Sequence, residues 1–120
     1  MPKILRKTYQ LKISLKDTKP PIWRRFLIEN SVGLLKLHEA TQIVMGWTDS
    51  HLHQFIVGDR CYGVPDPDFD FLEVLDEKKC RLRQLLKQEK DSIIYEYDFG
   101  DGWEHKLTLE KILPFDPEAA

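Results

Sequence analysis

The chain begins with a stretch in which hydrophobic and polar residues alternate. Hydrophobic residues occupy every second position from 9 to 15, and this period of two predicts a strand with one buried face. The segment 17–21 ends the strand, because its two consecutive prolines cannot continue a hydrogen-bonded ladder. Residues 22–28 predict a second strand, and we expect it to pair with the first in the antiparallel direction.

A second segment carries hydrophobic residues at helical spacing. The residues at this spacing are Leu37, Ala40, Ile43, Val44 and Trp47. They predict one apolar stripe on a helix that covers residues 34–45. Gly46 is expected to end this helix, because glycine readily adopts the left-handed conformation found at helix C-termini.

Shorter patterns predict the remaining elements. They are a strand at 52–57, a turn at 58–59, a short strand near 61–62, a short helix at 81–87 and a hairpin of strands 92–99 and 103–113. The sequence therefore predicts a single α+β domain over residues 1–120. We expect a mainly antiparallel sheet of about five or six strands, roll-like, packed by one main helix and one short helix.

The last hairpin also suggests a register. A three-residue loop at 100–102 brings the apolar faces of the two strands together, with glycine at the left-handed position. The pairs are then Tyr97 with His105, Tyr95 with Leu107, and Ile93 with Leu109. This register places Asp98 opposite Glu104, and two like charges across a ladder require a basic side chain, a cation or water between them.

Composition limits the class of protein. The chain has 120 residues, of which 42% are hydrophobic and 32% charged, so it can form a core and a well-solvated surface. Its hydrophobic runs are too short to cross a bilayer, and no signal peptide is evident. Two cysteines, Cys61 and Cys80, do not make a disulfide framework. We therefore expect a cytoplasmic protein with free thiols and no membrane partner.

Charge is distributed unevenly, although the net charge is only −2. Residues 1–25 hold eight basic side chains and one acidic side chain, a net +7, whereas residues 26–78 hold three basic and ten acidic, a net −7. The basic first hairpin is thus a candidate surface for a protein or nucleic-acid partner. Solvated strand faces explain the same distribution equally well.

The histidines suggest a metal site. His51 and His53 lie two apart in a predicted strand, so both imidazoles project from one face. The donors that could complete the site are His38 and His105, with Asp49 or Asp98 as carboxylate ligands. The principal metal candidates are therefore His51, His53 and His105, in an arrangement suited to hydrolysis. The alternative is that these histidines hydrogen-bond to the backbone.

Other motifs carry less information. Asp66, Asp68, Asp70 and Glu77 have the spacing of a calcium loop, but Phe71 replaces the glycine that the loop requires. The triplet at 98–100 matches the magnesium-binding triplet of kinases, without any phosphate-binding loop. Neither motif supports an assignment. The tryptophans at 23, 47 and 103 are expected in the core, with Trp103 partly exposed.

Three blocks of sequence together point to a family. The first block is Pro-Pro-Ile-Trp-Arg-Arg at 20–25. The second begins with Leu-His-Glu at 37–39 and continues through Gly46-Trp47 to Ser50-His51-Leu52. The third is Tyr-Asp-Phe-Gly-Asp-Gly-Trp-Glu-His at 97–105, which continues to Leu109-Glu110-Lys111. The chain resembles the plasmid Ri ORF-3-like family of bacteria and archaea, which is associated with mobile elements. The resemblance implies an α+β roll-like domain and no established activity.

Two further features of that family bear on this chain. Some members are labelled TnpR-type resolvases, but the supporting arginines, long dimerisation helix and helix-turn-helix that such recombinases need are missing here. Family members also commonly continue into a block containing proline and cysteine. This chain ends at Ala120 without that block, so it is either a short member or lacks a C-terminal part.

The motif blocks contain polar residues without an obvious packing role, and Trp103 is added because it flanks the hairpin tip. These candidate binding residues are Arg24, Arg25, His38, Asp49, His51, Asp98, Asp101, Trp103 and His105. The favoured hypothesis is a non-catalytic interaction module for a protein or nucleic acid. The alternative is a metal-dependent hydrolase with a His/Asp cluster. The sequence requires no cofactor and identifies no catalytic residue.

Overall fold

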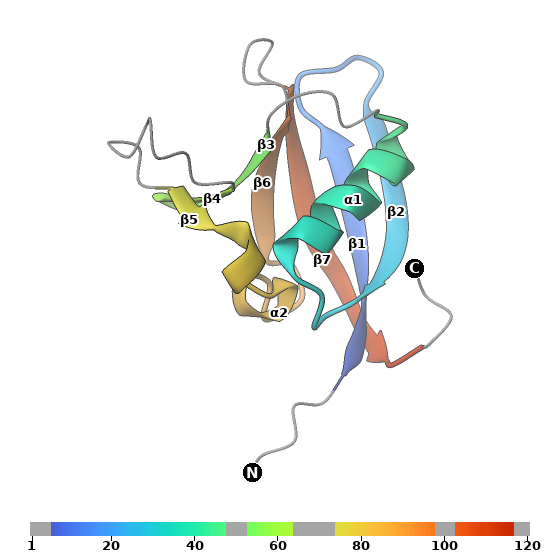
Figure 1. The fold of residues 1–120 in the computed structure, drawn as a ribbon. Helices are drawn as coiled ribbons and strands as arrows, with labels where there is room; N and C mark the ends of the chain where they lie inside the picture. The colour runs from blue at the N-terminus through green and yellow to red at the C-terminus, as the bar shows by residue number, and fades with distance from the viewer. Residues whose placement is uncertain (1–5, 48–52, 64–73, 98–102, 117–120) are drawn as a thin grey trace.

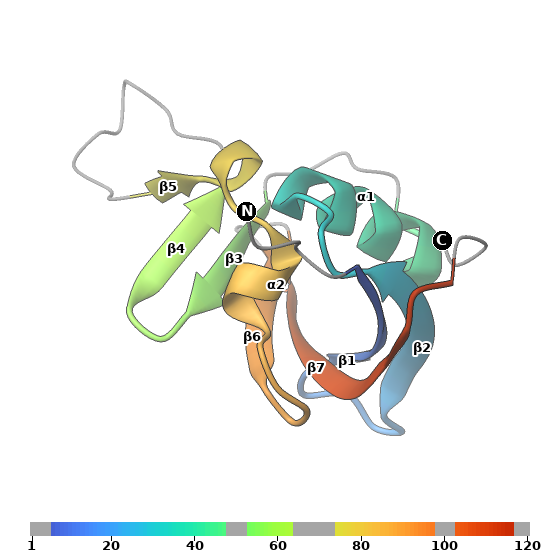
Figure 2. The same cartoon turned by 90° about the horizontal axis from the view of Figure 1, so that it is seen from below.

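One curved sheet organises the fold, and the main helix lies against its concave face (Figures 1 and 2). The computed structural model describes residues 6–47, 53–63, 74–97 and 103–116. The strands are β1 (Lys7–Leu15), β2 (Ile22–Glu29), β3 (His53–Val57), β4 (Arg60–Gly63), β5 (Val74–Asp76), β6 (Ser92–Tyr97) and β7 (Trp103–Pro114). The helices are α1 (Leu34–Met45), the short 3-10 helix η2 (Glu77–Lys79) and α2 (Leu82–Leu85). The strand order is β2-β1-β7-β6-β3-β4-β5.

The predicted α+β class is confirmed, but the described residues form a sheet of seven strands where five or six were expected. The additional strand is β5, which pairs with β4 in the parallel direction. Its three residues are too few to show a period of two in the sequence. The helix η2, which follows β5 directly, also left no periodic signal.

The first hairpin forms as its alternating pattern predicts. Tyr9, Leu11, Ile13 and Leu15 are all buried, and they contribute the β1 part of the core. β1 and β2 pair in the antiparallel direction, from Thr8 opposite Glu29 to Leu15 opposite Ile22. β1 also pairs with β7, which makes it a central strand, whereas β2 lies at an edge of the sheet.

Helix α1 covers the predicted residues, but its buried face differs from the predicted stripe. Gly46 ends the helix with a φ of 75°, as expected. Ile43, a member of the stripe, is 81% exposed. The buried residues of the helix are Leu34, Leu37, His38, Thr41 and Gln42. Three of these five are polar, so a pattern of hydrophobic positions could not locate this face.

The last hairpin has the predicted faces but a different register. Tyr97 pairs with Trp103, Tyr95 with His105 and Ile93 with Leu107, a shift of two residues from the predicted pairs. A shift of two preserves which side chains share a face, so matching apolar faces could not distinguish the two registers. The predicted partner of Glu104, Asp98, lies outside the described residues.

In the observed register Glu104 lies opposite Glu96. Lys16 Nζ lies 3.2 Å from Glu104 Oε1, and Gln54 Nε2 donates to Glu96 Oε1 at 2.7 Å. A basic side chain therefore compensates one carboxylate and an amide the other. This arrangement relieves the repulsion expected between like charges across a ladder.

The three tryptophans divide between the core and the surface. Trp47 packs against the core, as predicted. Trp103 is 39% exposed, which agrees with the expectation that it is partly accessible. Trp23 was expected in the core but is 43% exposed. It is on the outer sheet face, because it pairs with Ser14 and β1 buries the alternate residues on the other side.

Candidate functional site

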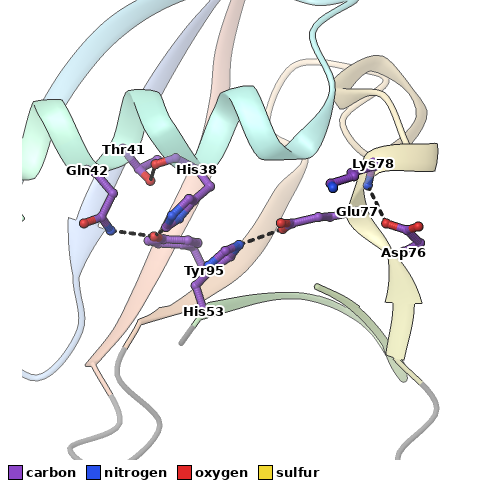
Figure 3. Close-up of polar contacts among 8 residues, drawn as sticks. All are labelled: His38, Thr41, Gln42, His53, Asp76, Glu77, Lys78 and Tyr95. Carbon is purple, nitrogen blue, oxygen red and sulfur yellow. Dashed lines mark hydrogen bonds and ion pairs between the residues drawn. The ribbon is translucent and has the colours of Figure 1, made fainter. Parts of the chain in front are cut away.

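A group of buried polar side chains lies between α1 and the sheet (Figure 3). It consists of His38 and Gln42 from α1, His53 from β3, Glu77 from η2 and Tyr95 from β6. We call these five residues the histidine–tyrosine cluster. Four separate elements of the chain contribute to it, so the cluster forms only when the domain is folded.

The hydroxyl group of Tyr95 joins two side chains of the helix. Gln42 Nε2 donates to this oxygen at 2.8 Å, and His38 Nδ1 lies 2.6 Å from it. Gln42 and His38 are four residues apart on α1, so both project from the same face of the helix toward β6. These contacts anchor the buried polar face of α1 to the middle of the sheet.

His53 and Glu77 form a second buried contact. His53 Nε2 lies 2.7 Å from Glu77 Oε2, and the Glu77 side chain has no exposed area. The other carboxylate oxygen, Glu77 Oε1, is buried without a hydrogen-bond partner among the described residues. An unsatisfied buried carboxylate oxygen is costly, so this atom marks the place in the cluster where a polar group or a water would be stabilised.

The two contacts are connected through the histidine rings. His38 and His53 stack with 3.5 Å between their ring centroids and 9° between their planes. When Glu77 accepts from Nε2 of His53, the Nδ1 atom of that ring becomes its hydrogen-bond acceptor. A histidine oriented by a carboxylate can act as a base or as a metal ligand. The His53 side chain retains 10% exposure.

His105 lies on the other side of Tyr95, and its ring is held in one tautomer. Its Nε2 accepts a hydrogen bond from Trp47 Nε1 at 3.3 Å, and its Nδ1 is 3.1 Å from the carbonyl oxygen of Tyr95. Since the carbonyl can only accept, Nδ1 carries the proton. Burial lowers the pKa of His105 below its usual 6.5 and favours the neutral ring.

These positions bear on the predicted metal site. His38, His53 and His105 all surround Tyr95, with ring centroids 5.4–6.2 Å from its ring. Within residues 6–47, 53–63, 74–97 and 103–116, however, no group of three or more His, Cys, Asp and Glu side chains is arranged to hold a metal ion. His51, the third metal candidate, lies outside the described residues.

Several of the acidic residues that the sequence suggested as ligands also lie outside the described residues. Asp49, Asp98 and Asp101 lie outside the described residues, as do Asp66, Asp68 and Asp70 of the weighed calcium loop. Glu77, the last residue of that loop pattern, pairs with His53. A buried contact with a histidine from β3 is a different role from a ligand in a continuous loop.

Arg24 and Arg25 lie on the edge strand β2, on opposite faces of the sheet. The Arg25 guanidinium forms two hydrogen bonds to the Glu110 carboxylate, at 2.6 and 3.0 Å. This contact with Arg25 lowers the pKa of Glu110 to about 2. Arg24 Nη1 donates to the backbone carbonyl of Trp23 at 3.1 Å. Both arginines thus occupy exposed positions on the edge strand, apart from the buried histidine–tyrosine cluster.

Sequence reasoning identified the histidines of the cluster but missed Gln42, Glu77 and Tyr95. Tyr95 was interpreted as one apolar residue in a strand, and Glu77 was considered only as the last residue of the calcium-loop pattern. The available signal was the four-residue spacing of His38 and Gln42, which places two polar groups on one helix face. No feature of the sequence indicated that this face is the buried one.

Comparisons with known proteins identify the family of this chain. The chain belongs to the family described as plasmid pRiA4b ORF-3-like protein, whose match covers residues 7–120. The family predicted from the three sequence blocks is thereby confirmed. The described part of the chain contains no helix long and apolar enough to cross a membrane.

Two relatives show how far the similarity extends. The uncharacterized protein y4hQ of Sinorhizobium fredii (strain NBRC 101917 / NGR234) is 35% identical over 105 residues, which cover 88% of this chain and 54% of y4hQ. The chain thus spans about half the length of this curated relative. The crystal structure of the protein of unknown function MM3350 from Methanosarcina mazei Go1 matches with a TM-score of 0.83 and 37% identity, over 99% of this chain and 68% of that one.

Proposed function

We propose that this domain is a non-catalytic interaction module that binds an acidic, extended segment of a protein partner along the edge of β2. The observation that carries the proposal is the exposure of this edge strand. Ile22 and Trp23 are 40% and 43% exposed at the start of β2, and β2 pairs in the described sheet with β1 alone. An extended segment can add to such an edge through main-chain hydrogen bonds.

The side chains around Trp23 favour an acidic segment. Lys12 Nζ and the Arg25 guanidinium lie 5.0 and 5.1 Å from the centre of the Trp23 ring. Lys19 and Arg24 are exposed on the same hairpin. The edge strand therefore offers an aromatic contact flanked by Lys12 and Arg25 on one face of the sheet and a further cation, Arg24, on the other face, which suits an extended segment carrying carboxylates.

The same surface disfavours a nucleic acid, the other partner considered from the sequence. Glu96, Glu104 and Glu110 share the outer sheet face with Trp23, by the strand registers. Lys16 and Arg25 are already engaged by two of these carboxylates. A phosphate backbone laid across this face would meet these acidic groups, whereas a strand added at the edge would lie beside β2 only.

The proposal is tested with a synthetic eight-residue peptide that alternates glutamate and valine, blocked at both ends. Amide chemical shifts and hydrogen exchange are measured with and without the peptide. We expect shifts and slowed exchange within β2, weakened roughly 10-fold by Arg24→Glu and by Trp23→Ala. Lys79→Glu makes the same charge change in η2, which directly follows β5 at the other end of the sheet order, and it should leave binding unchanged.

Three results would overturn this function. The first is the absence of any β2 response to the acidic peptide. The second is binding that Arg24→Glu and Lys79→Glu reduce equally, because this would show an effect of net charge alone. The third is salt-sensitive binding of an oligothymidylate through β2 in place of the peptide, because it would indicate a nucleic-acid partner.

A further inference from the structure

A pocket separate from both the histidine–tyrosine cluster and the β2 edge lies where β4 meets α2. Its volume is about 430 Å³, within the range of small-molecule sites. It is lined by Arg60 and Tyr62 of β4, by Cys80, Arg83, Gln84 and Leu85, and by Lys87. The pocket is therefore built from segments that are more than fifteen residues apart in sequence.

The ionisable charge that lines this pocket is of one sign. Arg60, Arg83 and Lys87 contribute three positive charges, and neither aspartate nor glutamate is among the lining residues. In the part of the chain that the structure describes, none of these three side chains is placed in an ion pair. Three cations gathered around one hollow repel one another, and a bound anion would relieve that repulsion.

The local hydrogen bonds support this arrangement. The backbone N–H of Arg83 donates to the Asn30 carbonyl at 2.9 Å, which fixes the position from which the Arg83 side chain extends. Gln84 Oε1 accepts from the backbone N–H of Arg81 at 2.6 Å. The amide oxygen of Gln84 is thus engaged, and its NH₂ group is the end that can donate to a ligand.

Two nearby groups bear on the charge of the pocket. Asp91 Oδ2 accepts from the backbone N–H groups of Lys87 and Gln88, at 2.9 and 3.1 Å, and these bonds lower the pKa of Asp91, so this carboxylate stays ionised beside Lys87. Asp91 does not line the pocket, and its single negative charge offsets the three lining cations only in part. Burial raises the pKa of the Cys80 thiol. The thiol is therefore neutral at pH 7 and adds no negative charge to the lining.

We propose that this pocket binds a small phosphate ester that carries an apolar group. The phosphate would be held by Arg60, Arg83 and Lys87, because guanidinium groups form paired hydrogen bonds to its oxygens. The apolar group would rest against Tyr62 and Leu85, which line the same pocket. This site is independent of the function proposed for the edge of β2.

The test uses three probes, namely phenyl phosphate, inorganic phosphate and phenol, titrated by calorimetry into the full chain. Phenyl phosphate should bind in the millimolar range or tighter, inorganic phosphate more weakly, and phenol without measurable affinity. Raising NaCl from about 20 to about 200 mM should weaken the phenyl phosphate complex, because the site is open to solvent and salt screens its charges.

Variants distinguish this site from a general effect of charge. Arg60→Gln combined with Arg83→Gln should weaken phenyl phosphate roughly 10-fold or more. The control is Lys106→Gln combined with Lys111→Gln, which removes the same charge from two exposed positions on β7 and should leave the affinity unchanged. Lys87→Gln changes one exposed side chain and provides a second variant if the arginine pair does not fold.

The proposal would be overturned by the absence of heat and of phosphorus chemical-shift change at about 10 mM phenyl phosphate. Equal losses in the pocket and β7 variants would also overturn it. Inorganic phosphate binding as tightly as phenyl phosphate would contradict the assigned role of Tyr62 and Leu85. Selective loss in the pocket variants, with thermal stability retained, would support the site.

Discussion

The imidazole rings of His38 and His53 lie face to face in the interior, 3.5 Å apart and almost parallel. Two positive charges at this distance would repel one another strongly in a buried environment. Glu77 Oε2 lies 2.7 Å from Nε2 of His53, so this carboxylate fixes the orientation of one ring of the stack. The stack and the carboxylate thus form one electrostatic unit that links α1, β3 and η2.

The first prediction concerns the carboxylate of Glu77. Glu77→Ala should lower the free energy of unfolding by about 3 kcal/mol, because it removes a fully buried partner of His53. Glu77→Gln should stay within about 1 kcal/mol of the parent, because the amide oxygen still accepts from His53 and no formal charge is buried. Urea denaturation followed by circular dichroism measures both values.

The comparison of the two Glu77 variants is informative because Oε1 has no partner among the described residues. If Glu77→Gln proved as destabilising as Glu77→Ala, the negative charge itself would be required. A positive charge would then have to lie beside it, and a bound metal ion would be one candidate for that charge.

The second prediction concerns the hydroxyl group of Tyr95. Tyr95→Phe removes an oxygen that contacts both His38 and Gln42 and should cost about 2 kcal/mol. Tyr9→Phe is the control outside the cluster, because its buried hydroxyl donates to the Leu86 carbonyl at 2.7 Å beside the Asn30 side chain, and it should cost about 1 kcal/mol. Equal losses in chemical denaturation would contradict the central place assigned to Tyr95.

Helix α1 shows which features of the fold the sequence could predict and which it could not. Residues 34–45 and the terminating glycine were predicted correctly, because helical spacing and the left-handed C-terminus depend on local chemistry. The buried face was misplaced, because Gln42 is buried while its neighbour Ile43 is 81% exposed. Burial of a polar residue depends on a partner elsewhere in the chain, here Tyr95, and no local pattern reports it.

The candidate site, like helix α1, could be predicted only in part. His38, His53 and His105 lie around Tyr95, but among the described residues they are not arranged to hold a metal ion, and the predicted site with His51 stays a prediction. Glu77 could not be found, since the contact with His53 spans 24 residues and depends on the unpredicted strand β5. Long-range pairings of this kind are decided by packing between elements, not by spacing along the chain.

The third prediction concerns the surface pair of Arg25 and Glu110. The Arg25 guanidinium lowers the pKa of Glu110 from 4.5 to about 2. The pair therefore contributes stability above pH 4.5 and loses it as pH falls toward 2. Because Arg25 is 47% exposed, Glu110→Gln should cost less than about 1 kcal/mol at pH 7.

Denaturation of the parent and of Glu110→Gln at several pH values measures this contribution. The two stabilities should converge between pH 4.5 and 2, and high salt should reduce the difference at pH 7. A difference that persisted undiminished at pH 2 would show that the loss comes from packing and not from the charge pair.

The last prediction concerns His105 and mild acid. Burial lowers the pKa of this histidine below 6.5, and a proton on Nε2 would displace the hydrogen bond from Trp47. Below pH 6.5 the unfolded chain therefore takes up a proton at this position that the folded chain does not. Stability should fall as pH drops below 6.5, by at most about 1.4 kcal/mol per pH unit from this one group.

His105→Gln removes the titrating group and should be less stable than the parent at pH 7. Its stability should nevertheless decline less steeply between pH 6.5 and 5, since one source of proton uptake by the unfolded chain is gone. Tyr9→Phe serves as the control, because it lowers stability by loss of a buried hydrogen bond and should retain the parent slope. Equal slopes for the parent and His105→Gln would show that burial does not suppress protonation of His105 in the folded state.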